Sequence, residues 1–307
     1  MVARVPFIQQ LDVQHDTVSP HVWAIVLTGD APPAPGRGHR PQRHRPVRGP
    51  LGVTATAPPP RAQRALERAS RLAAAGQMMT VVTRQRAAAW ERELAALPRG
   101  PRVVQPVYRG RAAEVLLPLL KIVRQDPAAT VVVLPVAQRV DHDARFLRYV
   151  SRAVWAVAVR PDVPILIGAQ PYAPVADGWI EPGAPVEGLE ALAVRTVKHF
   201  VDDASPSERR RLFDGHALMS TSIFVARAAT LLALAERQLP EVLEALEPLE
   251  DVFGRPEESL LCEAIYECMP QADLDHLERA PELAVLALPD VAWRAPDREP
   301  TLQLLAS

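Results

Sequence analysis

Residues 22–28 read Val-Trp-Ala-Ile-Val-Leu-Thr, and Gly29 and Asp30 follow them directly. A short apolar run that ends at a glycine predicts a buried first strand opening into a loop. Residues 30–60 are dominated by Pro, Gly, Arg and His, and we expect them to form a long, poorly ordered loop. Proline fixes φ and removes an N–H donor, which excludes a regular helix or a central strand in that segment.

Apolar runs alternate with helical patterns along the rest of the chain. Helices are predicted over 61–75, 84–97, 111–125, 146–159, 207–214, 226–238 and 256–266. Strands are predicted over 79–83, 103–105, 130–134, 164–168 and 283–288. Residues 189–201 alternate with a period of two, which predicts an antiparallel strand. The alternation of strands and helices is typical of βαβ units and therefore of an α/β protein with a mostly parallel sheet.

The composition is that of a folded chain, with 48% hydrophobic and 23% charged residues among 307. These values exclude an intrinsically disordered protein. The N-terminal residues have no long apolar core, so we expect no secretory signal. No apolar run reaches the roughly 18 residues of a membrane span, so we expect no membrane association. Cys262 and Cys268 lie six apart, a spacing that fits neither a CxxC redox pair nor a zinc site. We therefore expect a cytoplasmic protein.

Several segments match, in order, the motifs of one enzyme family. They are Trp23–Gly29, Gln105–Ala112, Val133–Gln138, Gly168–Pro171 with Asp177–Ile180, Val197–Ala204, Ser220–Phe224 and Ala292–Trp293. This series resembles the sugar-nucleotide pyrophosphorylases, and specifically the bacterial mannose-1-phosphate guanylyltransferases. The resemblance implies a Rossmann-like, GT-A-like nucleotidyltransferase domain over residues 21–295, with a mixed, mainly parallel sheet flanked by helices. Residues 1–20 would be an N-terminal extension and 296–307 a C-terminal tail.

The family transfers a nucleotide from a nucleoside triphosphate to a sugar-1-phosphate and uses Mg²⁺. In this chain the residues that handle charge depart from the family pattern. Asp30 replaces a loop glycine, the loop lysine falls near Gly49, and the metal-holding aspartates correspond to Ala137 and Ala295. The whole chain contains two lysines, Lys121 and Lys198, and no asparagine. These losses argue against Mg²⁺ binding, and we name no catalytic and no metal-ligating residue.

The resemblance still assigns candidate binding residues. Thr28, Gly29, Gln105 and Arg109 correspond to nucleotide-binding positions, and Gly178 to a sugar-binding position. The implied partner is a nucleoside triphosphate or a nucleotide-sugar. The first hypothesis is an impaired or inactive guanylyltransferase-like paralogue that binds or regulates, in which case a protein partner is expected.

Two alternatives remain open at this point. The chain could be an active nucleotidyltransferase with relocated ligands, in which Asp141 or Asp143 holds the metal and Arg37 or Arg40 the phosphate. It could also be a non-enzymatic polyanion binder that uses the arginine-rich residues 37–48. That segment has no aromatic residue for base stacking, so a nucleic-acid partner is not expected.

Two further polar clusters favour a structural interpretation. Asp141-His142-Asp143 is interpreted as the solvated start of a helix. Asp273, Asp275, His276 and Glu278 are interpreted as a surface turn.

Overall fold

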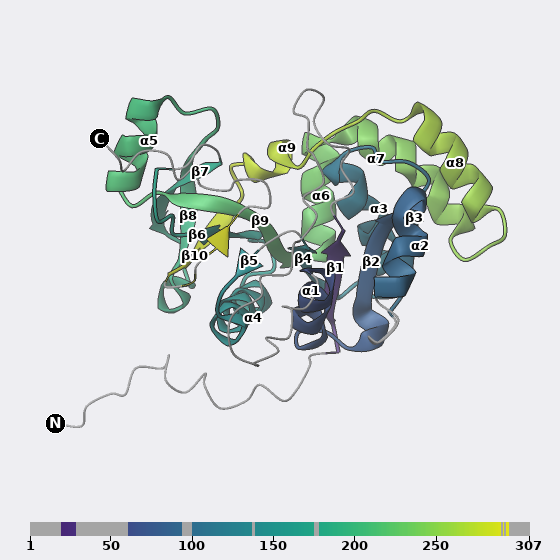
Figure 1. Ribbon diagram of the computed structural model, residues 1–307, viewed down its shortest axis with the longest axis horizontal. Coiled ribbons are helices and arrows are strands. Elements are labelled where there is room, and N and C mark those ends of the chain that lie inside the picture. The colour runs from purple at the N-terminus through teal and green to yellow at the C-terminus, as the bar shows by residue number, and fades with distance from the viewer. Residues whose placement is uncertain are drawn as a thin grey trace, which may run out of the picture.

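The computed structural model describes residues 20–28, 61–93, 100–136, 139–174, 178–289, 291 and 293–294. β1 (Val22–Leu27) is buried along its whole length and lies in the interior of a nine-stranded sheet (Figure 1). The strand order is β3-β2-β1-β4-β9-β6-β10-β8-β7. The apolar run at residues 22–27 therefore forms a buried strand, as predicted.

The first half of the sheet is parallel. β1 is flanked by β2 (Met78–Thr83) and β4 (Thr130–Pro135), and β2 pairs with β3 (Arg102–Gln105). β1 and β2 are both buried along their length and consist of apolar residues and threonine. Strands of this composition are typical of a parallel sheet whose two faces are both covered by helices.

The second half of the sheet is largely antiparallel and closes on itself. β9 (Leu218–Arg227) pairs antiparallel with β4 and with β6 (Ile165–Ala169), and β6 pairs parallel with β10 (Ala284–Leu288). β8 (Val194–Val201) and β7 (Trp179–Pro185) follow, both antiparallel. Because β7 also pairs with β9, these five strands form a closed ring. β5 (Arg139–Val140) and β11 (Trp293–Arg294) make a separate two-stranded sheet.

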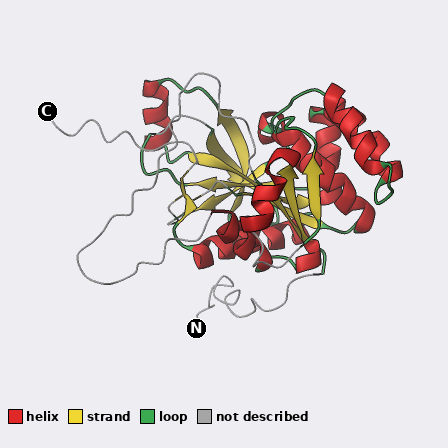
Figure 2. Cartoon of the chain, turned by 45° about the vertical axis from the view of Figure 1, so that its right-hand side comes forward, coloured by secondary structure: helices red, strands yellow, loops and turns green. Residues whose placement is uncertain are grey.

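Helices cover both faces of the sheet and define two apolar cores (Figures 1 and 2). One core joins the sheet to α1 (Arg61–Ser70), α2 (Arg84–Glu93) and α4 (Asp143–Val159). The other joins it to α3 (Arg111–Gln125), α6 (Ala228–Gln238), α7 (Pro240–Leu246) and α8 (Glu258–Cys268). α5 (Pro206–Asp214) lies beside β7 and β8, and α9 (Asp275–Glu278) precedes β10. Short 3-10 turns occupy Ala75–Gln77, Glu190–Leu192 and Glu247–Val252.

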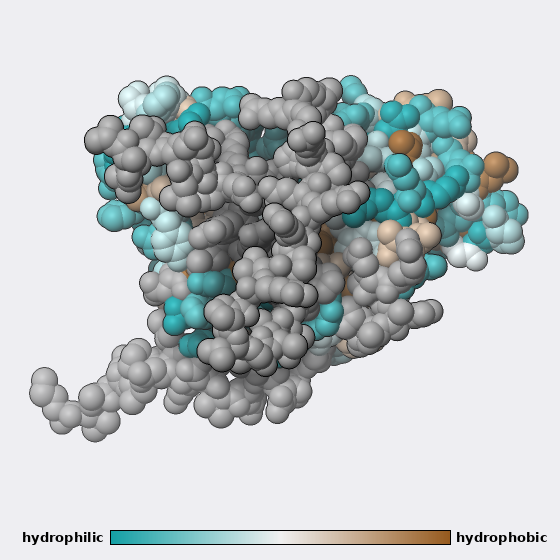
Figure 3. Space-filling view, viewed as in Figure 1, coloured by the Kyte–Doolittle hydropathy of each residue, from teal (hydrophilic) through white to brown (hydrophobic). Residues whose placement is uncertain are grey.

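The surface facing the viewer is mainly polar where it is described, with apolar residues in scattered spots (Figure 3). Among the described residues, no helix is both long and apolar enough to cross a bilayer.

The α/β class and the mixed sheet predicted from the sequence are confirmed, and α3 has the predicted bounds. The description of the sheet as mainly parallel holds for β3-β2-β1-β4 and not for the closed second half. β7 and β9 were not predicted from the sequence. β7 carries Pro182, Gly183 and Pro185, and β9 contains the polar run Ser220-Thr221-Ser222, so neither has an uninterrupted apolar pattern.

Candidate functional site

The four parallel strands end along one edge of the sheet. The chain moves outward from β1 through β2 to β3 and then returns to the opposite side of β1 at β4. In α/β sheets of this kind, ligands bind beyond the carboxyl ends of the strands where the order reverses. The edge formed by the ends of β1 to β4 is therefore the candidate site.

Thr28 is the first residue after β1 and lies at this edge. Its N–H donates to the carbonyl oxygen of Val81 on β2 at 3.4 Å, and the residue is buried. On the other side, the N–H of Val136 donates to the carbonyl oxygen of Leu27 at 2.9 Å, which ties the end of β4 to β1. Thr28 Oγ1 has no hydrogen-bond partner among the described residues. Buried polar atoms are normally satisfied, so this hydroxyl is available to a ligand or a water.

Gln105 is the last residue of β3 and stands opposite Thr83 of β2. Its side chain is fully buried, and Nε2 donates to Oη of Tyr266 on α8 at 2.9 Å. The other amide atom, Oε1, finds no partner within the described part of the chain. Tyr266 is itself fully buried, and this burial raises the pKa of its phenol well above the ordinary value. The pair therefore stays neutral and fixes the orientation of the Gln105 amide.

Arg109 is directed at helix α8. Its Nε donates to the backbone carbonyl of Tyr266 at 2.5 Å, and Nη2 donates to the carbonyl of Glu267 at 2.7 Å. Both carbonyls belong to the last turn of α8, where unpaired carbonyl groups attract cations. This predicted nucleotide-binding arginine thus uses two of its N–H donors to cap a helix.

The N-terminus of α3, next to Arg109, is closed by the chain itself. Arg111 N donates to Asp273 Oδ1 at 3.0 Å, and Ala112 N donates to the carbonyl of Ala272 at 3.1 Å. Ala272 N in turn donates to the carbonyl of Arg109 at 3.2 Å. The first N–H groups of a helix are a ready anion site, and here two of them are already occupied.

A second polar group joins Gly178, β9 and α9. Ser220 N donates to the carbonyl of Gly178 at 2.7 Å, and Ser220 Oγ donates to Glu278 Oε2 at 2.9 Å. Glu278 is 5% exposed. Burial raises the pKa of its carboxyl, while the charge of Arg111 and the hydroxyls of Ser222 and Ser220 act in the opposite direction. The predicted sugar-binding glycine therefore lies beside a buried carboxyl that is linked electrostatically to α3.

The interpretation of Asp273, Asp275, His276 and Glu278 as a surface turn is wrong for Glu278. The other three residues are exposed, and Asp273 caps α3, but Glu278 points inward onto β9. α9 turns its Leu277 and Glu278 into the protein, while Asp275 and His276 stay outside. The sequence pattern could not separate the four, because an acidic residue in a four-residue helix carries no periodic signal.

The Asp141-His142-Asp143 segment leads into α4, as expected. Asp143 Oδ1 accepts a hydrogen bond from Nε of Arg68 at 2.6 Å, and the buried Arg68 side chain also lies over the Phe146 ring. Asp143, a candidate for a relocated metal ligand, is therefore held in an ion pair. Within the described residues, no three His, Cys, Asp or Glu side chains are grouped to hold a metal ion.

Other predicted positions fall outside the described residues. These are Gly29, Asp30, Arg37, Arg40, the 37–48 segment, Gly49, Ala137 and Ala295. Within the Val197–Ala204 segment, Asp202 bonds to Arg279 and Asp203 adopts a positive φ of 50°. Lys198 is exposed on β8.

Comparison with known proteins places this chain by its fold. No protein-family model matches the sequence, and no curated protein matches it. Among solved structures, it is similar to mannose-1-phosphate geranyltransferase from Thermus thermophilus, with a TM-score of 0.67 and 23% identity, over 89% of this chain and 76% of that one. It is also similar to mannose-6-phosphate isomerase from Helicobacter pylori, with a TM-score of 0.64 and 13% identity, over 89% and 99% of the two chains. The chain shares its fold with these two proteins.

Proposed function

We propose that this chain is a mannose-1-phosphate guanylyltransferase-like protein that binds a nucleotide or nucleotide-sugar at the edge formed by β1 to β4 and has little or no catalytic activity. The observation that carries the binding is the pair of buried oxygens, Thr28 Oγ1 and Gln105 Oε1, each without a partner in the described part of the chain. Hydroxyl and amide groups of this kind are suited to the edge of a base or to a ribose hydroxyl.

The weak catalysis is inferred from what the charged groups do. Phosphoryl transfer depends on cations and N–H donors placed around the reacting phosphate. Here Arg109 caps α8, the first N–H groups of α3 are bonded to residues 272–273, and Asp143 pairs with Arg68. These contacts support a role in binding or regulation, and a protein partner remains an expectation from the sequence.

The ligand class is supported by the structural neighbours. Both are named for a mannose phosphate, which favours a mannose phosphate over other sugars. The guanine nucleotide is what the sequence resemblance implies. The expected compartment is the cytoplasm, since Cys262 and Cys268 are both free thiols.

Calorimetry with GTP, ATP and GDP-mannose, each with and without Mg²⁺, tests this proposal. We expect saturable binding of at least one of them, and no formation of nucleotide-sugar from nucleoside triphosphate and mannose-1-phosphate. Thr28→Val removes the unpartnered hydroxyl and should weaken binding by about threefold to tenfold. Thr230→Val on α6, whose hydroxyl bonds to the Pro161 carbonyl, is the matched control and should leave affinity unchanged.

Two results would contradict the proposal. Turnover at about 1 s⁻¹ or faster would indicate an active enzyme with relocated ligands. Equal nucleotide affinity in the wild type and the Thr28→Val variant would show that the nucleotide does not bind at this edge.

A further inference from the structure

Helix α4 presents a regular row of side chains on its outward side. The opposite side packs onto the sheet through Phe146, Leu147, Val150, Ala153, Ala156 and Val157. The outward row repeats at intervals of three and four residues and consists of Arg145, Arg148, Arg152, Trp155 and Val159. This is the spacing of a seam along which two helices pack. Trp155 is 59% exposed and Val159 54%, and exposed aromatic side chains of this size are enriched at interfaces.

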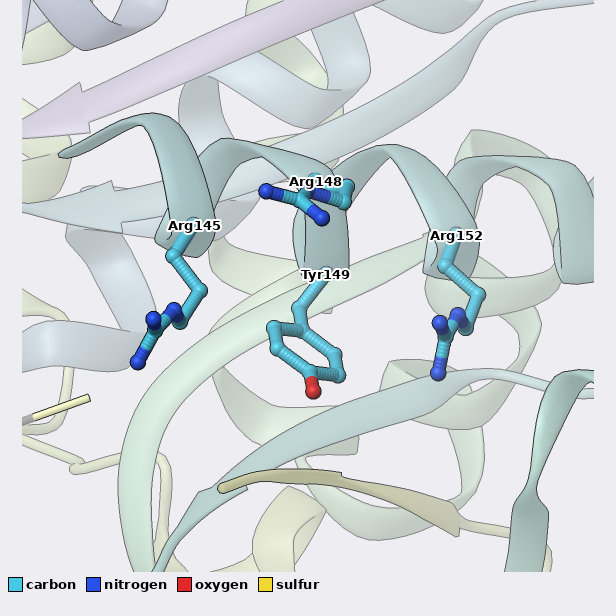
Figure 4. A pocket seen from close by; sticks show the side chains of 4 residues that line it. All are labelled: Arg145, Arg148, Tyr149 and Arg152. Carbon is cyan, nitrogen blue, oxygen red and sulfur yellow. The ribbon is translucent and has the colours of Figure 1, made fainter. Parts of the chain in front are cut away.

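The N-terminal half of the row surrounds a hollow. It measures about 200 Å³ and is lined by Arg145, Arg148, Tyr149 and Arg152 (Figure 4). Residues at i, i+3, i+4 and i+7 are the four that form the hole in knobs-into-holes packing of helices. Arg145, Tyr149 and Arg152 extend to the same side of the helix, with Tyr149 between the two arginines. The guanidinium carbon of Arg152 lies 5.0 Å from the centre of the Tyr149 ring, a cation–π contact that orients this wall of the hole.

The chemistry of the hole suits an aromatic ring. Arg145 and Arg148 already take part in interactions within the protein, so they serve as walls of the hole and not as donors to a ligand. A guanidinium group accepts an aromatic ring on its flat face, and the methylene stem of an arginine offers apolar contact. An indole gives the strongest contact of this kind. Trp155 carries such a ring on the same face of the same helix.

We propose that α4 packs antiparallel against α4 of a second copy of this chain, with Trp155 of each copy in the hole of the other. The hole is centred between Arg148 and Tyr149, so a two-fold axis near Arg152 fills both holes at once. One patch then serves both copies, as a two-fold dimer interface requires. The cation–π contact draws the Arg152 guanidinium one turn away from this axis, which separates it from its counterpart in the second copy.

The distribution of charge favours the antiparallel arrangement. The arginines lie in the N-terminal half of α4, and the last turn of the helix contains no basic residue. Just beyond that turn, Arg160 is paired with Asp162. A helix C-terminus carries partial negative charge, and the antiparallel pair brings Arg145 of one copy beside Val159 at that end of the other. A parallel pair would instead place each arginine beside its own counterpart, where like charges repel.

The size of the face sets the strength of the dimer. α4 has 17 residues and is about 25 Å long. A standard stable interface buries about 800 Å² per partner, which is more than one helix face of this length supplies. We therefore expect a weak dimer with a dissociation constant of about 10 to 100 µM.

Sedimentation velocity of the full chain at concentrations on both sides of this value tests the proposal. We expect a monomer–dimer equilibrium in the wild type, and dimerisation about thirtyfold weaker or more in Trp155→Ala, because a central tryptophan is a typical hot spot. Tyr172→Ala is the matched control, since it removes an aromatic side chain that is 69% exposed outside α4, and it should dimerise as the wild type does. Both replaced side chains are exposed, so both variants should keep the melting temperature of the wild type.

Cysteine cross-linking tests the orientation of the two helices. The background is Cys268→Ser, which removes the exposed native thiol. Under oxidation, Arg152→Cys should form a disulfide with its own counterpart near the axis, whereas Val159→Cys should not. A mixture of the Arg145→Cys and Val159→Cys variants should form a disulfide between the two chains, because these positions face each other in the antiparallel pair.

Three results would overturn the proposal. A wild type that stays monomeric over the whole range would leave this face to a different protein. Equal dimerisation of the wild type and Trp155→Ala would place the interface between copies elsewhere, and self-cross-linking of Val159→Cys would contradict the antiparallel arrangement. Thr28→Val should dimerise as the wild type does, so the outcome is independent of the nucleotide proposal.

Discussion

The backbone N–H of Arg111 donates a hydrogen bond to Oδ1 of Asp273 at 3.0 Å, from one end of α3 to a residue 162 positions away. The neighbouring N–H of Ala112 is taken by the carbonyl of Ala272. In a helix that binds phosphate, such N–H groups face the ligand. Here the chain supplies its own acceptors, so a carboxylate and a carbonyl take up the donors that an anion would use.

Asp273→Ala should open this helix end. Loss of a side-chain acceptor at a helix N-terminus costs about 1 kcal/mol of unfolding free energy, and urea denaturation will measure it. If the site accepts phosphates, nucleotide affinity should rise in the same variant. Asp214→Ala, which removes an exposed carboxylate at the end of α5, is the control and should change neither quantity. An unchanged stability in Asp273→Ala would show that the capping bond contributes nothing.

Gly110→Ala should be strongly destabilising because the residue is both left-handed and crowded. Its φ is +89°, and a Cβ there would lie 2.0 Å from the carbonyl oxygen of Ala272. Gly188 provides the matched comparison, since its φ is +81° and nothing lies within 4 Å of its Cβ position. We expect Gly188→Ala to cost about 1 to 2 kcal/mol and Gly110→Ala more than about 3 kcal/mol. Thermal unfolding of the two variants measures both losses of stability. Equal losses in Gly110→Ala and Gly188→Ala would rule out a steric contribution at Gly110.

The parallel half of the fold could be predicted because its signals are local. Val22–Leu27 and Val131–Leu134 are continuous apolar runs, the first closely followed by Gly29 and the second by Pro135. Thr28 directly follows β1, and Gln105 is the last residue of β3. Because the ends of parallel strands lie along one edge of a sheet, the sequence also predicts that these two residues share that edge. β9 was missed because its pairing partners, β4, β6 and β7, come from three distant segments, and its Ser220–Ser222 stretch is polar.

The remaining site features are tertiary. Glu278 is buried because α9 packs against β9, and Asp273 becomes a cap because the chain returns to α3. Arg109 matches a family motif, yet its guanidinium contacts backbone carbonyls of α8, about 157 residues further along the chain. Nothing in the sequence around Arg109 predicts that contact. A motif indicates which residue types are present, whereas the packing of distant helices decides which of their donors are already used.

Tyr266→Phe should destabilise the protein because Gln105 loses its hydrogen-bond partner. The change deletes the phenol that accepts from Nε2 and leaves a second buried polar atom of Gln105 unsatisfied. We expect a loss of about 1 to 3 kcal/mol in unfolding free energy. The double variant Gln105→Leu/Tyr266→Phe removes both polar groups and should lose less than the sum of the two single variants. Additive losses in a double-mutant cycle would mean that the two side chains do not interact.

Glu278 should make the protein less stable as the pH rises. Its folded-state pKa is raised by burial above the ordinary value of a glutamic acid. Between those two values the folded protein holds a proton that the unfolded chain has released, so the unfolding free energy falls with increasing pH. Stability from this group is fully present below the ordinary pKa and is lost as the pH rises through the raised one.

Chemical denaturation from about pH 4 to about pH 8 measures this slope. Glu278→Gln cannot ionise and keeps an acceptor for Ser220 Oγ, so its stability should vary less with pH and exceed that of the wild type at the upper end. Glu236→Gln, on the exposed side of α6, is the matched control and should follow the wild-type curve. If the Glu278→Gln variant instead became less stable at neutral pH, Glu278 would be acting as a carboxylate stabilised by Arg111, Ser220 and Ser222. Arg111, Ser220 and Ser222 would then outweigh burial, and the charged form of the Glu278 carboxyl would be favoured.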